Sequence, residues 1–238
     1  MRSDALDEVR LALRQILPAG VCSSAGLLSD TASPLHEAER AATARMSPRR
    51  LQEFCAGRTQ ARIVLRELGV APPFVAVSPA RAPLWPTGVV GSISHTGELA
   101  LAVAARANDV RSIGIDIEPA VPLDAELLHR VCLPAEVARL GDPPRAATRA
   151  KLTFSAKEST YKCLAPLTGI FLEFEDVEIR FDWEGLRFTA SGHGPKSAVI
   201  DEASIAGHFA LAGGHWLTAA WIAPPHRSGG DGNQCPGG

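Results

Sequence analysis

The sequence predicts an α/β (α+β) protein of two similar, pseudo-twofold halves, each a helix packed on a small, mostly antiparallel sheet. A strongly signalled helix at residues 47–69 is followed by three short apolar strands, and a long helix at about 145–164 is followed by two pairs of strands. Short turns with glycine or Asn-Asp separate neighbouring strands, as is typical of antiparallel connections. Residue identity between the halves is too weak to make them a sequence repeat.

The first half opens with helices. Residues 4–17 have the apolar spacing of a short amphipathic helix ended by Pro18-Ala19-Gly20, and a loop then leads to a second helix at 37–45. Ser47-Pro48 provides an N-cap and a first-turn proline for the helix at 47–69. Gly69 supplies its C-terminal stop.

One edge of this helix is basic. At 100° per residue, Arg50, Arg58 and Arg62 lie on one side of the helix, in a chain whose formal net charge is −2. From the sequence alone, a solvated face whose stems cover apolar surface is the favoured interpretation. An anion-binding edge is the alternative.

The strands of the first half follow a proline-rich stretch at 70–88. They are expected at 89–95, at 99–105 and at 112–118, with the turn at Asn108-Asp109 between the last two. Because side chains alternate along a strand, the isoleucines of the last strand face the core, and Gly114, Asp116 and Glu118 face the other way.

Two carboxylates on one strand face can hold a divalent cation that prefers oxygen ligands. The Asp-x-Glu spacing is common, however, and does not identify a site by itself. It recurs at Asp124/Glu126, Asp176/Glu178 and Asp182/Glu184.

The second half begins with short helices at 125–132 and 134–140, before the long helix that Pro166 is expected to end. Strand pairs are expected at 173–181 with 186–190 and at 204–212 with 215–222. The predicted divisions are an N-terminal half at 1–118, a C-terminal half at 119–223 and a flexible tail at 224–238.

Composition excludes several classes. The near-neutral net charge and the 5% of aromatic residues argue against nucleic-acid binding. No apolar run approaches the roughly 18 residues of a membrane span, and the acidic N-terminus does not resemble a signal peptide. The 5 cysteines are scattered and odd in number, which indicates free thiols in a reducing compartment, so we expect a cytoplasmic protein.

The long helix carries Lys151, Ser155, Glu158 and Lys162 on one face. A Glu-Lys pair four residues apart is most often surface stabilisation worth a few tenths of a kcal/mol. The Glu158–Lys162 pair indicates a functional site only in combination with the other motifs.

Three segments together resemble the 4′-phosphopantetheinyl transferases of the surfactin- and enterobactin-synthesis type. They are Gly-Ser-Ile-Ser-His at 91–95, Gly-Ile-Asp-Ile-Glu at 114–118 and Phe-Ser-Ala-Lys-Glu-Ser-Thr-Tyr-Lys at 154–162. The pattern of arginines at 50–62 and Trp-Pro-Thr-Gly at 85–88 are similar to motifs of the enterobactin synthetase component D-like subgroup. The resemblance spans roughly residues 34–222.

The resemblance implies a magnesium-dependent transferase, with manganese as a substitute metal. Its members move the phosphopantetheine arm of coenzyme A onto a serine of an apo acyl or peptidyl carrier protein and release adenosine 3′,5′-bisphosphate. It also implies a monomer with a pseudo-dimeric fold and an active site in the cleft between the halves. The sequence leaves open which fatty acid, polyketide, nonribosomal peptide or siderophore pathway is served.

Site residues follow from the resemblance. Asp116, Glu118 and Glu158 would bind the metal, with Glu158 also the base and Lys162 stabilising charge on the leaving phosphate. The remaining coenzyme A contacts would come from Arg50, Arg58, Arg62, Arg81, Ser94, His95 and Lys157.

Two other functions remain open. A magnesium-dependent phosphohydrolase would use the same three carboxylates with water as the nucleophile, and would cleave coenzyme A slowly without an acceptor protein. A coenzyme A binding module would keep the basic edge without catalysis. The intact Glu158 and Lys162 argue against the second alternative.

Overall fold

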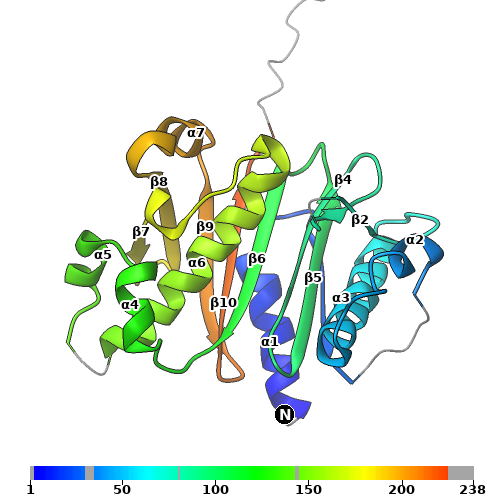
Figure 1. Cartoon of the computed structure of the whole chain (residues 1–238), viewed down its shortest axis with the longest axis horizontal. Coiled ribbons are helices and arrows are strands. Elements are labelled where there is room, and N and C mark those ends of the chain that lie inside the picture. The colour runs from blue at the N-terminus through cyan, green and yellow to red at the C-terminus, as the bar shows by residue number, and fades with distance from the viewer. Residues whose placement is uncertain (1–2, 30–34, 80, 143–144, 225–238) are drawn as a thin grey trace, which may run out of the picture.

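The computed structural model describes residues 3–29, 35–79, 81–142 and 145–224. Its two larger antiparallel sheets lie side by side (Figure 1), and a two-stranded sheet, β2-β3, is separate from them. The smaller sheet has the order β1-β5-β4, and the larger has the order β6-β10-β9-β8-β7. The strands are β1 (Cys22–Leu27), β2 (Ala76–Val77), β3 (Pro83–Leu84), β4 (Val89–His95), β5 (Leu99–Arg106), β6 (Ser112–Pro119), β7 (Val177–Asp182), β8 (Arg187–Gly192), β9 (Ala206–Ala212) and β10 (His215–Ile222).

Most helices lie close to their predicted positions, but the one expected at 37–45 has only 4 residues and the one at 197–202 was not predicted. The helices are α1 (Ser3–Ile16), α2 (Glu37–Arg40), α3 (Pro48–Glu67), α4 (Ala125–Val131), α5 (Pro134–Arg139), α6 (Arg145–Thr168) and α7 (Ser197–Glu202), with 3₁₀ turns at η1 (Phe174–Asp176) and η2 (Gly194–Lys196). The Ser47 hydroxyl accepts from the Arg50 N–H, as expected of the N-cap of α3. Among the described residues, no helix is long and apolar enough to span a bilayer.

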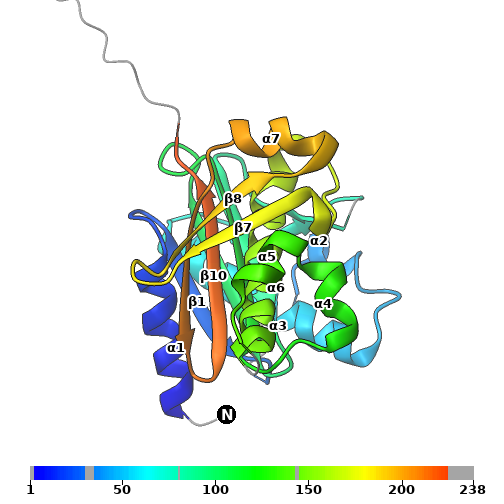
Figure 2. The same ribbon diagram turned by 90° about the vertical axis from the view of Figure 1, so that its left-hand side faces the viewer.

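The two faces of the sheets are covered differently. Alternate residues of β5 divide between two cores, with Leu101 and Val103 facing α1, and Ala102 and Ala104 facing α3. Figure 2 shows α1 and α6 on opposite faces of the larger sheet. The core beneath α1 also takes residues of β1, β6 and β10, so it runs under both sheets. The fold is therefore two sheet-plus-helix halves over one shared core.

The two sheets meet at β4 and β6, which pack closely although they belong to different sheets. Serine side chains bridge them. The Ser92 hydroxyl accepts from the Ile115 N–H at 3.1 Å, and the Ser94 hydroxyl donates to Asp116 Oδ1 at 2.8 Å. This seam sets the position of the carboxylate strand relative to the strand that carries His95.

Three further differences from the predictions concern β1, β6 and the end of α6. Residues 22–27, expected in a loop, form β1, which pairs with β5 from Cys22↔Ala104 to Leu27↔Leu99. The strand at 112–119, which the predicted boundary assigns to the first half, pairs with β10 of the larger sheet. Pro166 does not end α6, because the Gly169 N–H and the Thr168 hydroxyl still bond to carbonyls of the last turn. The predicted tail lies, apart from Pro224, outside the described residues.

Candidate active site

A cleft of about 340 Å³ opens over the seam between the two sheets. Its walls are α3 and α6, and its floor includes the ends of β4 and β6. The lining residues are Arg50, Glu53, Phe54, Gly57, Arg58, Arg81, Pro83, Ile93, Ser94, His95, Asp116, Glu118, Phe154, Glu158 and Lys162. Most of the residues that the sequence singles out are thus brought together.

Gly114 explains how α6 reaches this cleft. A Cβ atom at Gly114 would lie 2.0 Å from the Ser159 carbonyl oxygen and 2.5 Å from the Cys163 nitrogen. The helix backbone therefore crosses directly over this glycine, and any side chain would push it away. A hydrogen bond from the Ser112 hydroxyl to the Cys163 carbonyl, at 2.6 Å, fixes the same crossing.

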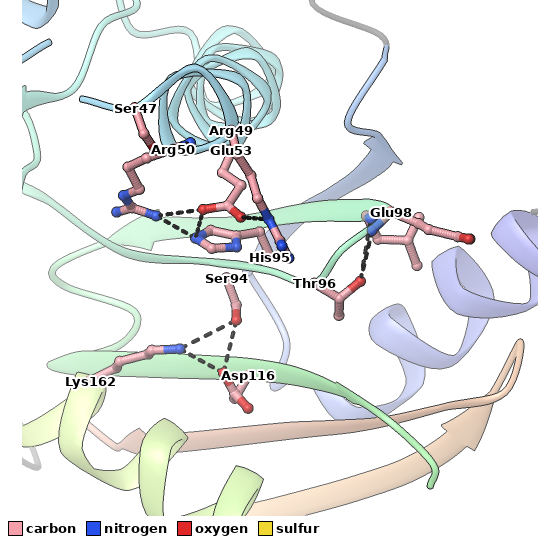
Figure 3. A network of polar contacts seen from close by, with 11 residues as sticks. Ser47, Arg49, Arg50, Glu53, Ser94, His95, Thr96, Glu98, Asp116 and Lys162 are labelled. Carbon is pink, nitrogen blue, oxygen red and sulfur yellow. Dashed lines mark hydrogen bonds and ion pairs between the residues drawn. The ribbon is translucent and has the colours of Figure 1, made fainter.

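Two lysines of α6 hold the two strand carboxylates. Lys162 Nζ donates to Asp116 Oδ1 at 2.6 Å and also lies 3.3 Å from the Ser94 hydroxyl (Figure 3). Lys151 Nζ donates to Glu118 Oε2 at 3.2 Å. Asp116 is only 4% exposed, and its second oxygen, Oδ2, is buried without a hydrogen-bond partner. One buried acceptor in the cleft is therefore left open.

Glu158 differs from the other two carboxylates. Its side chain makes no hydrogen bond and no ion pair with another described residue. Burial raises its pKa, and nearby Asp116 and Glu118 raise it further, while Lys162 lowers it. A half-buried carboxylate without a partner and with a raised pKa is suited to accept a proton.

These oxygen donors suit a hard divalent cation such as Mg²⁺. Asp116 Oδ2 and the Glu158 carboxylate have no hydrogen-bond partner among the described residues, so their oxygens could serve as ligands for such an ion. Burial, together with the nearby charge of Asp116, raises the pKa of Glu118. Across the described part of the chain, however, no three His, Cys, Asp or Glu side chains are grouped closely enough to hold a metal ion. Each of the two strand carboxylates is instead paired with a lysine, Asp116 with Lys162 and Glu118 with Lys151.

On the α3 wall, Glu53 joins Arg50 to His95 (Figure 3). Arg50 Nη1 lies 2.6 Å from His95 Nε2 and 3.3 Å from Glu53 Oε2. Arginine can only donate, so Nε2 accepts and the imidazole is neutral. Burial likewise lowers the pKa of His95, and this outweighs Glu53, which raises it. The 3.7 Å approach of Glu53 to Nε2 is consequently not an ion pair in this state.

Arg58 lies deeper in the same wall. It is 5% exposed, its guanidinium sits 4.4 Å above the Phe54 ring centroid, and its Nε has no hydrogen-bond partner. Burial lowers its pKa to about 10, so it stays charged at neutral pH. Arg81 faces the cleft from the loop before β3, with a φ of 65°. Arg50, Arg58 and Arg81 thus form a cationic end of the cleft.

Two predicted ligand contacts are not supported by where the side chains lie. Arg62 is buried and donates to Glu39 Oε2 at 2.7 Å, and Lys157 is buried and forms an ion pair with Glu136 at 2.7 Å. Lys157 also donates to two backbone carbonyls, each at 2.8 Å. Neither side chain lines the cleft, because each is already engaged by a glutamate from another segment.

Two lining residues, Glu53 and Phe54, and the role of Lys151 beside the cleft were not predicted from the sequence. Glu53 and Phe54 follow Arg50 by three and four residues, so the helical spacing that selected the arginines could have selected them also. Lys151 was placed on the correct helix face but given no role. Its pairing with Glu118, on a strand more than thirty residues away, is visible only in the folded chain.

Comparisons with known proteins find similarity in the sequence segments that form most of both larger sheets. The family model "4'-phosphopantetheinyl transferase N-terminal domain" matches residues 38–105, and "4'-phosphopantetheinyl transferase superfamily" matches residues 112–218. The chain is 42% identical to the 4'-phosphopantetheinyl transferase Svp of Streptomyces mobaraensis over 68% of this chain and 67% of that protein. It is 38% identical to PptT of Mycobacterium tuberculosis over 81% and 86%, and 44% identical to enterobactin synthase component D of Escherichia coli over 54% and 62%.

Proposed function

The chain belongs to the 4′-phosphopantetheinyl transferase family, and from that premise we propose that its cleft transfers the 4′-phosphopantetheine group of coenzyme A to a serine hydroxyl of an apo acyl or peptidyl carrier protein. The serine oxygen bonds to the phosphorus that carries the pantetheine arm. The bond from that phosphorus to the bridging oxygen breaks, and adenosine 3′,5′-bisphosphate leaves.

The unpaired state of Glu158 is the observation that carries this proposal. A serine hydroxyl is a weak nucleophile until its proton has an acceptor. Glu158 is half-buried, has a raised pKa and has no competing partner among the described residues. Lys162 lies one helical turn further on the same face and stabilises the charge that develops on the leaving phosphate.

The phosphates are held from both walls. Arg50 and the neutral His95, with the Ser94 hydroxyl, face the position proposed for the pyrophosphate. Arg58 and Arg81 bind the 3′-phosphate by charge-assisted hydrogen bonds, and the open Nε of Arg58 is a donor free for it. Arg62 and Lys157 have no part in these contacts.

Asp116, Glu118 and Glu158 are the residues that would hold Mg²⁺. When bound, the ion neutralises charge on the phosphates during transfer. Both walls of the cleft come from one chain, which supports a monomer as the active form. A cytoplasmic location follows from the scattered, odd set of cysteines and is part of the same proposal.

The test is to incubate the purified chain with coenzyme A, Mg²⁺ and an apo carrier protein, and to weigh the carrier by mass spectrometry. We expect the carrier to gain the mass of one phosphopantetheine group. Consumption of coenzyme A without a carrier would support a phosphohydrolase instead. Binding without any conversion would support a coenzyme A binding module.

A further inference from the structure

Three ionisable residues of α6 follow one another toward β6 in the order Lys151, Glu158, Lys162, and the two lysines pair with the strand carboxylates. The side chains of the Lys162–Asp116 pair are 27% and 6% exposed, and those of Lys151–Glu118 are 18% and 23% exposed. Pairs so withdrawn from water are screened less than surface pairs. The two ammonium groups therefore compete with any other cation for the carboxylates of Asp116 and Glu118.

A divalent cation would have to bind these carboxylates beside the two ammonium groups. Asp116 Oδ1 already accepts from Lys162 and from Ser94, and Glu118 Oε2 accepts from Lys151. A second cation brought beside an ammonium group is repelled by it. Three carboxylates thus line one cleft, but among the described residues they form no group close enough to hold a metal ion.

We propose that Lys151 and Lys162 keep Asp116 and Glu118 closed to a divalent cation until the pyrophosphate of coenzyme A draws the two ammonium groups away, so that cation and coenzyme A bind cooperatively. The inference rests on the proposed function. A lysine ammonium is a compact charge with three donors on a flexible stem, so it can move from a carboxylate to a phosphate while its helix stays in place. The carboxylate oxygens that it leaves are then free for the ion.

Thermodynamic linkage makes the proposal measurable without catalysis. If coenzyme A raises the affinity for the cation by some factor, the cation raises the affinity for coenzyme A by the same factor. Couplings of this kind are commonly about five- to 150-fold. Lys151 is the useful variant site, because it pairs with Glu118, is not one of the lining residues and carries no role in proton transfer.

The experiment titrates Mn²⁺ into the full chain, with free Mn²⁺ counted by electron paramagnetic resonance, without and with saturating coenzyme A. The solution binding of Mn²⁺ by coenzyme A alone is measured and subtracted. We expect coenzyme A to tighten Mn²⁺ binding at least about fivefold. Lys151→Met should tighten Mn²⁺ binding without coenzyme A by up to about fivefold, as expected for loss of a partly exposed ion pair.

The variant should also reduce the enhancement by coenzyme A by the same factor. If Lys151→Met tightened Mn²⁺ binding equally with and without coenzyme A, the lysine would act only as a nearby positive charge, and the proposal would be overturned. Equal Mn²⁺ affinity with and without coenzyme A in the unmodified chain would also overturn it, while leaving the proposed function intact. Mn²⁺ binding under neither condition would overturn the metal assignment as well.

Controls separate these effects from loss of fold. Lys196→Met removes a lysine that pairs with Asp176 at 2.7 Å, outside the cleft, and should leave both affinities unchanged. Lys162→Met tests the second ammonium group and should act in the same direction as Lys151→Met. Far-ultraviolet circular dichroism of each variant confirms that the protein titrated is folded.

Discussion

Helix α6 pairs two of its lysines with buried carboxylates, and the two pairs differ in how many of their polar atoms have hydrogen-bond partners. The Lys157–Glu136 pair is 1% and 2% exposed, and all its polar atoms have partners: the lysine also donates to two carbonyls, and the glutamate also accepts from two backbone N–H groups. In the Lys162–Asp116 pair the lysine is 27% exposed, and Asp116 Oδ2 has no partner.

The difference separates architecture from function. A buried charge is tolerated when its partners are complete, and removal of one partner then leaves an uncompensated charge. A pair that lines a cleft and leaves an acceptor open has capacity for a ligand. The motif Lys-Glu at 157–158 thus contains one residue that fixes the helix and one that faces the chemistry.

The largest effect that would sharpen this contrast is expected at Glu158. Glu158→Gln keeps the shape but removes the proton acceptor and one metal-ligand charge, so carrier modification should fall by about 10²- to 10⁴-fold or more. Initial rates measured by mass spectrometry of the carrier provide the test. Glu184→Gln, on an exposed turn, is the matched control. Near-normal turnover of Glu158→Gln at saturating Mg²⁺ would refute the proposed mechanism.

The lysine pairs themselves should respond in opposite ways. Lys157→Met leaves Glu136 buried and uncompensated, so the free energy of unfolding should drop by about 3–5 kcal/mol. Lys162→Met removes a more exposed partner inside an open cleft and should cost far less stability, while it abolishes most activity. Urea denaturation of both variants measures this difference. Equal losses of stability would break the distinction between the two pairs.

Arg58 and Arg62, one turn apart on α3, differ in the same way: Arg58 lines the cleft, whereas Arg62 donates to Glu39. Charge-assisted contacts contribute about 1.5–3 kcal/mol each, so Arg58→Ala should weaken coenzyme A binding by about ten- to a hundredfold. It should affect dephospho-coenzyme A much less, since that ligand lacks the 3′-phosphate. Calorimetric titration of both ligands tests this, with the exposed Arg66→Ala as the control. Equal weakening for the two ligands would place Arg58 elsewhere.

The smallest expected effect concerns pH. Because the pKa of Glu158 is raised in the folded state, its contribution to the free energy of unfolding is present below the ordinary value of 4.5 and is lost as the pH rises through the raised value. Glu158→Gln removes that dependence. At neutral pH the variant should therefore melt at a slightly higher temperature than the unmodified chain, and this difference should shrink on acidification. A lower melting temperature at neutral pH would show that Glu158 has a stabilising partner.

The sequence predicted what depends on local spacing. Strand alternation placed Asp116 and Glu118 on one face, and helical periodicity placed Glu158 and Lys162 on one side, and these four line one cleft. Spacing could not separate Arg58 from Arg62, because the glutamate that engages Arg62 comes from residue 39, in a different helix.

Two features of the fold were also beyond local pattern. The segment Cys-Ser-Ser-Ala-Gly-Leu at 22–27 has no strand alternation and contains no β-branched or aromatic residue. It forms β1 because its backbone pairs with that of β5. The membership of β6 depends on β10, about a hundred residues later, which supplies its backbone partners. The formation of β1 and the sheet to which β6 belongs both depend on pairing with strands distant in the sequence, which local propensity does not predict.

The core under α1 has a consequence for biosynthesis. Residues 3–16 pack against β9 and β10, the Gly213 N–H donates to Glu8 at 3.0 Å, and a Cβ at Gly213 would lie 2.5 Å from the Ala5 carbonyl oxygen. A ribosome makes the first helix early and the strands at 206–222 much later. During that interval α1 lacks Leu217 and Ala219 among its apolar partners, and β6 lacks the neighbour that completes its ladder. The carboxylate strand therefore reaches its final position only after nearly all of the described chain has emerged.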